Sequence, residues 1–189
     1  SIRDPNPVIF IEHRWLHGSE EKSLIKKNIN KQIGISKLLS KGNDFTVVTY
    51  SLSTIELLAL RKELNKNDIY FDHIDLQTIK PLDLNIVKKS VKKTKKLLVL
   101  DTISHPICSI GSEILSQVFL DKNIKLSKAP LLLTLPDVPA PTSTFYTKDY
   151  YISKEDILKN IEKLINKKIN IKTKNIIHDV PDSKFKGPF

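Results

Sequence analysis

The sequence predicts an α/β fold, a three-layer α/β/α sandwich around an open, mainly parallel sheet. From residue 44 onward, short apolar runs alternate with segments whose apolar residues recur at helical spacing. The apolar runs are continuous instead of alternating with polar residues, which is typical of strands buried on both faces of a parallel sheet. Short loops separate the two kinds of segment, and this favours helices that cross over both faces.

Four strands are expected in this regular part of the chain, over residues 45–50, 69–76, 97–100 and 129–135. The first of them, Phe45 to Tyr50, is rich in β-branched residues, so we expect it to be buried on both faces. The first helix should follow directly, because Ser53 and Glu56 stand at the spacing of a capping box.

Three more helices are expected, over residues 84–94, over residues 111–120 and after Ser153, which is placed to cap the last one. In the first of these three, Val87 and Val91 stand four residues apart and can share a buried face. The lysines around them should then point to solvent: Lys88, Lys89, Lys92, Lys93, Lys95 and Lys96.

Outside this regular part the chain has a different character. Pro7 to Glu12 is an apolar run bounded by proline that predicts a buried strand, with no neighbouring strand close in sequence. We therefore expect residues 1–17 to be the last element of a preceding domain, and residues 18–43 to be a linker with one or two short pieces of structure. The main domain is then expected over residues 44–169.

Two segments near the C-terminus are expected to lie on the surface. Three prolines within residues 136–141 preclude a helix or a central strand there and predict a stiff, extended segment. Residues 170–189 form an irregular tail, whose apolar residues are spaced for docking onto a surface: Ile176, Ile177, Phe185 and Phe189.

The composition argues against nucleic-acid binding, although the net charge is +10 from 31 basic and 21 acidic residues. Only Arg3, Arg14 and Arg61 are arginines, whereas base-edge and phosphate contacts favour the guanidinium group. Lysine, isoleucine and asparagine are abundant together, as an AT-rich coding sequence produces, so this composition explains the excess of lysine.

No apolar run approaches the roughly 20 residues that span a bilayer, and the N-terminus does not resemble a signal peptide. We therefore expect no membrane partner and a cytoplasmic location, or an organelle matrix in a eukaryote.

Metal and nucleophile chemistry find little support in the residue pattern. The five histidines show no metal-ligand spacing on an expected helix, and His13 with His17 is better explained as polar loop. Cys108 follows His105 by three residues, but no third group is identifiable that would orient such a pair, so a packing role is favoured.

The segment Ser109 to Ser112 opens a helix after a strand and a loop, where helix amides can hold an anion. Its single glycine is weak support for a phosphate site, and a structural helix entry is the better explanation. Three aspartates at strand ends or in a turn have local explanations as turn or cap residues: Asp75, Asp83 and Asp101. The residues alone therefore predict no complete active site.

Seven segments in order nevertheless resemble one family. They are residues 6–14, 41–50, 75–83, 90–94, 111–114 and 129–130, and residues 137–141 ahead of Tyr150-Tyr151. In this order they resemble the C-terminal half of the beta subunit of thiamin-diphosphate-dependent 2-oxoacid dehydrogenases, which act on pyruvate, branched-chain 2-oxoacids or acetoin. Transketolase and deoxyxylulose-phosphate synthase share the domain.

The resemblance implies a transketolase C-terminal domain preceded by the last strand of a pyrimidine-binding domain. In such enzymes a glutamate of the pyrimidine domain activates thiamin diphosphate, and the alpha subunit holds its diphosphate and Mg²⁺. The resemblance therefore implies no catalytic, cofactor-binding or metal-binding residue in this chain, which would be silent alone. The implied partners are a second beta subunit in a homodimer, an alpha subunit and, in multienzyme complexes, an acyltransferase core.

The resemblance also places seven residues in subunit contacts or in the turns that shape them: Asp75, Pro81, Asp83, Glu113, Asp137, Pro139 and Pro141. The first three would form a structural turn, the glutamate would open the third helix near the subunit boundary, and the last three would belong to a contact surface.

The chain departs from the family in three places. Gln77 stands where an arginine is usual, Asp101-Thr102 replaces an acidic pair, and residues 107–111 are less glycine-rich. The loss of the arginine weakens any ion pair inferred there. Two alternatives stay open: a stand-alone assembly or docking module, and another enzyme of the transketolase family.

Overall fold

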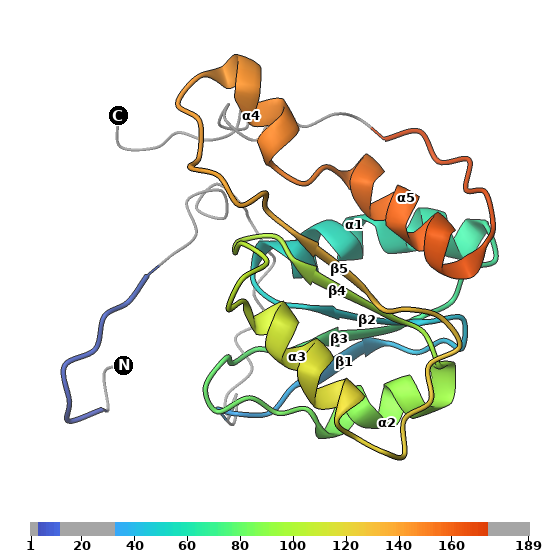
Figure 1. Cartoon of the computed structure of the whole chain (residues 1–189), viewed down its shortest axis with the longest axis horizontal. Coiled ribbons are helices and arrows are strands. Elements are labelled where there is room, and N and C mark those ends of the chain that lie inside the picture. The colour runs from blue at the N-terminus through green and yellow to red at the C-terminus, as the bar shows by residue number, and fades with distance from the viewer. Residues whose placement is uncertain (1–3, 12–32, 174–189) are drawn as a thin grey trace, which may run out of the picture.

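The computed structural model describes residues 4–11 and 33–173 (Figure 1). Its elements, in chain order, are β1 Lys37–Ser40, β2 Thr46–Thr49, α1 Leu52–Lys66, β3 Asp72–Asp75, α2 Asn85–Thr94, β4 Leu97–Asp101, α3 Ile110–Phe119, β5 Leu131–Thr134, α4 Thr144–Tyr150 and α5 Lys154–Ile165. The four expected strands and the four expected helices are all present.

One five-stranded sheet has the order β1-β3-β2-β4-β5. β2 pairs in parallel with both β3 and β4, and β4 pairs in parallel with β5. β1 pairs antiparallel with β3 at the edge of the sheet. This strand lies within residues 18–43 and is one of the short pieces of structure expected there. The prediction of a mainly parallel sheet is confirmed.

Helices cover both faces of the sheet, which confirms the three-layer sandwich (Figure 1). On one face, Leu57 of α1 and Ile161 of α5 are fully buried in one apolar cluster. On the other face, Val87 of α2 and Ile114 of α3 are fully buried in a second cluster. Val91 is buried with Val87, and Lys89 and Lys92 on the same helix are exposed, as the valine spacing predicts.

The predicted capping box at the first helix is wrong. α1 begins at Leu52, so Ser53 lies inside its first turn, and no side chain caps the helix at Ser51. The Ser53 hydroxyl is buried and donates to the carbonyl of Tyr50 at 2.7 Å, because the end of β2 passes closer to it than the helix amides do. At α5, by contrast, Ser153 caps the helix as predicted, in a capping box with Asp156.

The prediction of a buried strand over residues 7–12 is also wrong for its described part. Residues 7–11 are not in a strand, and Ile9 and Ile11 are 86% and 87% exposed. A strand needs a hydrogen-bonded neighbour, and among the described residues none runs beside this segment.

Residues 136–143 form neither helix nor strand, and residues 137–140 are exposed, as the prolines predict. The following helix α4 was not expected; the side chain of Ser143 caps it by accepting from the amide of Phe145. Ile169 and Ile171 pack against the apolar cluster beneath α5. The rest of the predicted docking tail, from residue 174 onward, lies outside the described residues.

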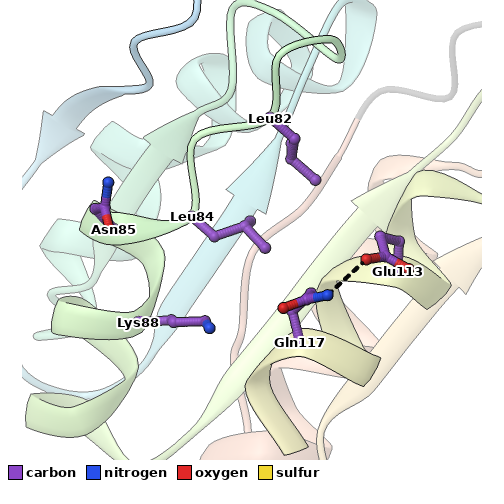
Figure 2. A pocket seen from close by; sticks show the side chains of 6 residues that line it. All are labelled: Leu82, Leu84, Asn85, Lys88, Glu113 and Gln117. Carbon is purple, nitrogen blue, oxygen red and sulfur yellow. Dashed lines mark hydrogen bonds between the residues drawn. The ribbon is translucent and has the colours of Figure 1, made fainter. Parts of the chain in front are cut away.

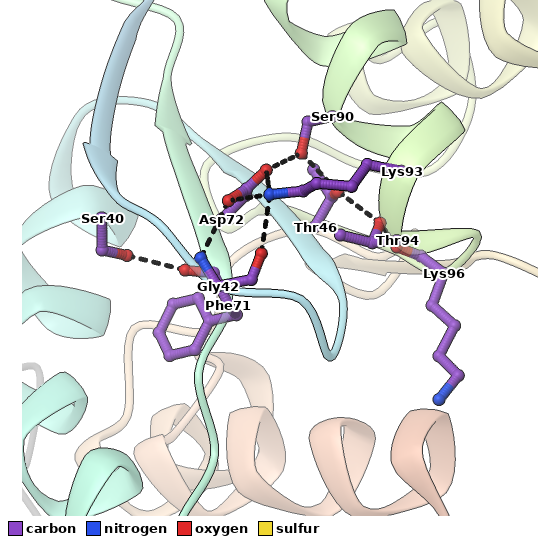
Figure 3. A network of polar contacts seen from close by, with 9 residues as sticks. All are labelled: Ser40, Gly42, Thr46, Phe71, Asp72, Ser90, Lys93, Thr94 and Lys96. Carbon is purple, nitrogen blue, oxygen red and sulfur yellow. Dashed lines mark hydrogen bonds and ion pairs between the residues drawn. The ribbon is translucent and has the colours of Figure 1, made fainter.

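A polar network fixes the amino end of the sheet (Figure 3). The Asp72 carboxylate is 3% exposed and accepts from the Gly42 amide at 2.9 Å, the Ser90 hydroxyl at 2.6 Å and the Lys93 ammonium at 2.8 Å. Thr46 bonds to Ser90 in turn, at 2.7 Å. These contacts hold the β1–β2 turn, β3 and α2 together.

Candidate functional site at the carboxyl edge of the sheet

The segments that follow β2, β3, β4 and β5 meet at one edge of the sheet, because these four strands are parallel. We call this the carboxyl edge, made of residues 50–55, 76–84, 102–109 and 135–143. Open α/β sheets generally bind their ligands and partners at such an edge. Of the seven residues that the sequence assigned to contacts or turns, five lie here, Asp75 is the last residue of β3 beside this edge, and Glu113 lies in the first turn of α3.

The turn after β3 is held by two aspartates. The Asp75 carboxylate accepts from the Thr54 hydroxyl at 3.2 Å and from the side-chain amide of Gln77 at 3.3 Å. Gln77, which the resemblance puts in place of an arginine, thus gives the Asp75 carboxylate an uncharged donor. The Asp83 carboxylate accepts from the amides of Ser36 at 3.1 Å and Asn85 at 3.0 Å, which connects the start of β1 to the start of α2.

Pro81 lies in the same turn and packs closely on Gly34. A Cβ on Gly34 would come within 2.7 Å of the Pro81 ring, and Gly34 has φ +86°, a conformation that favours glycine. Gly34 and Pro81 therefore fix how the chain enters β1. The assignment of this turn to a subunit interface stays a prediction.

At the end of β4, the buried Asp101 organises the first turn of α3. Its carboxylate accepts from the hydroxyl of Tyr50 and from the Gly111 amide at 2.9 Å. Burial and the adjacent Asp101 raise the pKa of Tyr50, which keeps the phenol protonated. The sequence explained Asp101 as a turn or cap residue; it proves to be a buried acceptor that joins three elements.

The N-terminus of α3 is satisfied by the chain's own side chains. The amide of Gly111 bonds to Asp101, and the amide of Ser112 donates to the Ser109 hydroxyl at 3.0 Å. A Cβ on Gly111 would lie 2.3 Å from Cδ1 of Leu132, so this glycine also allows α3 to pack closely on β5. The structural explanation of this helix entry is therefore supported, and the anion-binding explanation is not.

His105 and Cys108 lie in the loop after β4, and both are partly or fully exposed. The Nδ1 atom of His105 bonds to the carbonyl of Pro136 at 2.7 Å, which joins this loop to the segment after β5. Cys108 has φ +56°. The hydrogen bond explains His105 as a connection between two loops.

Sequence reasoning missed a buried histidine, His73, which lies within the strand β3. His73 of β3 is fully buried, and its Nε2 bonds to the Thr49 hydroxyl at 2.8 Å, which reaches Thr54 at 2.9 Å. Burial lowers its pKa to about 4; the charge of Arg61 acts in the same direction and that of Asp75 opposes it. The imidazole is therefore neutral near pH 7. No sequence signal distinguishes this buried histidine from one that is exposed to solvent.

The pKa of Glu56, near the start of α1, is shifted in the opposite direction. Burial raises its pKa to about 7, and the nearby Lys154 opposes the shift. A carboxyl whose pKa lies near neutrality exchanges its proton within the physiological range.

Glu113 lines a shallow cavity of about 370 Å³ between α2 and α3 (Figure 2). Leu82 and Leu84 form one wall, and Glu113 accepts a hydrogen bond from Gln117 at 2.9 Å on the other. Asn85 and Lys88 complete the polar rim. Four of its six lining side chains are polar or charged.

Large apolar side chains are exposed along this edge. Every one of the four segments, including the start of α1, contributes at least one, and we call the set the apolar rim: Ile55, Ile79, Ile103, Ile107 and Val138. Their exposed fractions run from 44% for Ile79 to 71% for Ile107. Contiguous patches of exposed apolar side chains are typical of protein–protein contacts, so the apolar rim is a candidate contact surface.

Two classes of site find no match among the described residues. His, Cys, Asp and Glu side chains do not gather there in a group of three or more that could hold a metal ion. Across the same residues, every helix is too short or too polar to cross a membrane.

Comparison with known proteins gives evidence that is independent of this geometry. The family described as "Transketolase, C-terminal domain" matches residues 34–157. "Pyruvate dehydrogenase E1 component subunit beta" from Rickettsia bellii is 32% identical over 165 residues, which are 87% of this chain and 50% of the relative. The protein of the same name from Rhizobium meliloti is 34% identical over 141 residues, 75% of this chain and 30% of the relative.

A further relative is "Acetoin:2,6-dichlorophenolindophenol oxidoreductase subunit beta" from Cupriavidus necator, 34% identical over 152 residues, 80% of this chain and 44% of the relative. The chain thus spans at most about half the length of these relatives. A solved structure, "Split gene transketolase, inactive beta4 tetramer", matches with a TM-score of 0.62 and 19% identity over 76% of this chain and 45% of that one. At this identity the match shows the fold alone.

Proposed function

This chain belongs to the transketolase C-terminal domain family, and we propose that it is the C-terminal domain of a beta-type subunit in a thiamin-diphosphate-dependent 2-oxoacid dehydrogenase. Its relatives include beta subunits of pyruvate dehydrogenase and of the acetoin enzyme, at 32–34% identity. In this proposal the domain serves subunit association and assembly, and chemistry takes place elsewhere in the enzyme.

The observation that carries the proposal is the apolar rim. It combines exposed isoleucines and a valine from four separate segments with a set of turns that internal hydrogen bonds hold in place. A preformed apolar surface loses little conformational freedom on association, so it suits a permanent subunit contact. The candidates for that contact are a second beta subunit and an alpha subunit, with an acyltransferase core where a multienzyme complex forms.

The proposal assigns thiamin diphosphate and Mg²⁺ to other parts of the enzyme. Its support is the start of α3, where Asp101 and Ser109 already engage the amides that a diphosphate would need. Titration calorimetry of the full chain with thiamin diphosphate and Mg²⁺ should therefore show no binding heat. Saturable binding would contradict this assignment and leave the assembly role to be tested separately.

The assembly role is tested by the oligomeric state of the full chain. Sedimentation velocity should show concentration-dependent association, and Ile107→Lys should weaken it at least about tenfold, as expected for a central apolar contact. The matched control is Leu120→Lys, which places the same charge at an equally exposed site, 72% against 71%, beyond the other end of α3. Association that survives Ile107→Lys, or that Leu120→Lys abolishes equally, would contradict a contact through the rim.

The mass of the native product tests the subunit assignment itself. A product well above 21.6 kDa in the source cells would support a domain within a longer beta subunit. A product of the same mass would favour a stand-alone assembly module.

A further inference from the structure

The opposite edge of the sheet carries a second exposed surface of different chemistry. It is formed by the end of α2, the end of α3 and the loop that follows α3, which lie beside one another (Figure 1). We call it the basic end patch, and it consists of Lys92, Lys95, Phe119, Leu120, Lys122 and Lys125. All six residues are exposed.

Two contacts hold the parts of this patch together. The Lys92 ammonium lies 4.0 Å from the carboxylate of Asp121, which joins α2 to the loop. The amide of Ser127 donates to the Lys95 carbonyl at 2.8 Å, which fixes the far end of the loop to the end of α2. Lys92 and Lys95 at the end of α2 are therefore joined to the loop that carries Lys122 and Lys125.

The apolar pair in the middle of the patch has no role in the core. Phe119 is 66% exposed and Leu120 is 72% exposed, whereas Ile114 and Val118 of the same helix are buried against the sheet. Two adjacent large apolar side chains at a helix end thus face solvent among four lysines. Asp121, which lies beside Lys92, is the one acidic residue within the described residues 119–127.

Helix stabilisation explains only part of this arrangement. Cations in the last turn of a helix interact favourably with its dipole, which accounts for Lys92 and Lys95 at the end of α2. Lys122 and Lys125 lie beyond the end of α3, and the dipole gives no reason for exposed apolar residues there. The exposed apolar pair together with the four exposed lysines indicates a contact surface.

We propose that the basic end patch docks an acidic protein segment that carries an apolar or aromatic side chain among its carboxylates. The carboxylates would face the lysines, and the apolar side chain would pack on Phe119 and Leu120. The patch contains no arginine, which base-edge and phosphate contacts favour, so nucleic acid suits it less well. A membrane suits it less well because the remaining apolar face of α3 is buried in the core and only its end is available for insertion.

The test uses the full chain and defined probes. Fluorescence anisotropy would measure binding of a random glutamate–tyrosine copolymer, of poly-L-glutamate and of oligo-dT, and vesicle sedimentation would measure binding to phosphatidylserine-containing membranes. We expect the copolymer to bind most tightly. The double variant Phe119→Ser, Leu120→Ser should weaken copolymer binding about tenfold and change poly-L-glutamate binding by less than about twofold.

Charge-reversal variants provide the second part of the test. Lys122→Glu with Lys125→Glu should weaken binding of both acidic polymers at least about tenfold at low salt. The matched control, Lys163→Glu with Lys168→Glu, changes charge equally at exposed sites at and beyond the end of α5, on the other face of the sheet. Oligo-dT or vesicles binding as tightly as the copolymer would overturn the proposal, as would an equal loss in the control.

This inference is separate from the assembly surface, and the two can fail separately. Ile107→Lys lies at the carboxyl edge and should leave polymer binding unchanged. A variant set in which Ile107→Lys alone removed polymer binding would place the contact at the apolar rim and overturn the basic end patch.

Discussion

Asp101 and Gly111 form a close contact at the carboxyl edge. The carboxylate of Asp101 bonds to the Gly111 amide, and the absence of a side chain on Gly111 lets Leu132 approach from β5. Both features are invisible in the sequence, where the glycine is read as a helix entry and the aspartate as a turn residue. Their roles depend on β4 and β5 lying side by side, which no local pattern reports.

Gly111→Ala is expected to destabilise the fold. The new Cβ would lie 2.3 Å from Cδ1 of Leu132, so the leucine or the helix must shift. Such overpacking costs about 1–3 kcal/mol, which exceeds the roughly 1 kcal/mol that alanine gains over glycine within a helix. Urea denaturation measures the difference. Ser116→Ala, at an exposed site on the same helix, is the control and should leave the unfolding free energy unchanged or slightly raised.

His73 predicts a pH dependence of stability. Its pKa is about 4 in the folded chain and about 6.5 when unfolded, so between these values the unfolded state binds more protons. The unfolding free energy should therefore fall as pH is lowered from about 6.5 to about 4, by about 3 kcal/mol in all. Above about pH 6.5 the contribution is fully present.

Glu56 opposes this trend, because its raised pKa means that the folded state binds the extra proton between pH 4.5 and about 7. The measurement is therefore made in a Glu56→Gln background. There the unfolding free energy at pH 5.0 should be about 2 kcal/mol below that at pH 7.0, and His73→Gln should remove this difference. An unchanged pH slope in the double variant would assign the effect to other groups.

At the scale of elements, the sequence predicts the helices and strands whose signals are local in the chain. The continuous β-branched runs predict the parallel strands, Val87 and Val91 predict the buried face of α2, and Ser153 predicts the start of α5. Two elements that the sequence leaves unspecified or misses depend on contacts distant in sequence. β1 is a short edge strand that pairs only with β3, and α4 is a seven-residue helix behind a proline-rich segment.

The network around Asp72 shows how elements are joined at the amino end of the sheet. Asp72→Asn would place an amide where three donors meet, from Gly42, Ser90 and Lys93. Buried donors that lose their acceptor cost about 1–3 kcal/mol each, so we expect the unfolding free energy to fall by at least about 2 kcal/mol. Thermal or urea unfolding checks this.

Asp68→Asn provides the control for that network. Asp68 is exposed, and its positive φ of 56° is one that asparagine tolerates well. Its substitution should change stability by less than about 0.5 kcal/mol. Equal effects at the two sites would mean that the network contributes no more than a surface charge does.

At the scale of the whole molecule, the apolar rim and the basic end patch lie at opposite edges of the sheet. Helices α1, α2, α3 and α5 begin at the carboxyl edge and end at the other, so residues that follow the parallel strands gather on one side and residues that follow these helices on the opposite side (Figure 1). All seven residues that the resemblance assigns to contacts or turns lie at or beside the carboxyl edge, and their part in subunit contacts stays a prediction. The sequence misses the apolar rim, because single exposed isoleucines become a surface only when the strand order brings their loops together.

This separation predicts that the two surfaces respond differently to salt. Association through the apolar rim buries isoleucine and valine side chains, and the hydrophobic term depends little on ionic strength in the millimolar range. Binding at the basic end patch depends on lysines in water, whose interactions are screened beyond about 8 Å at 0.15 M salt.

Raising sodium chloride from 50 to 500 mM should therefore change the self-association constant of the full chain by less than about threefold and weaken glutamate–tyrosine copolymer binding at least about tenfold. Sedimentation velocity and fluorescence anisotropy on one preparation measure both. If self-association weakened as steeply as polymer binding, lysines would have to contribute to it, and the contact between copies would then extend to the basic edge of the sheet.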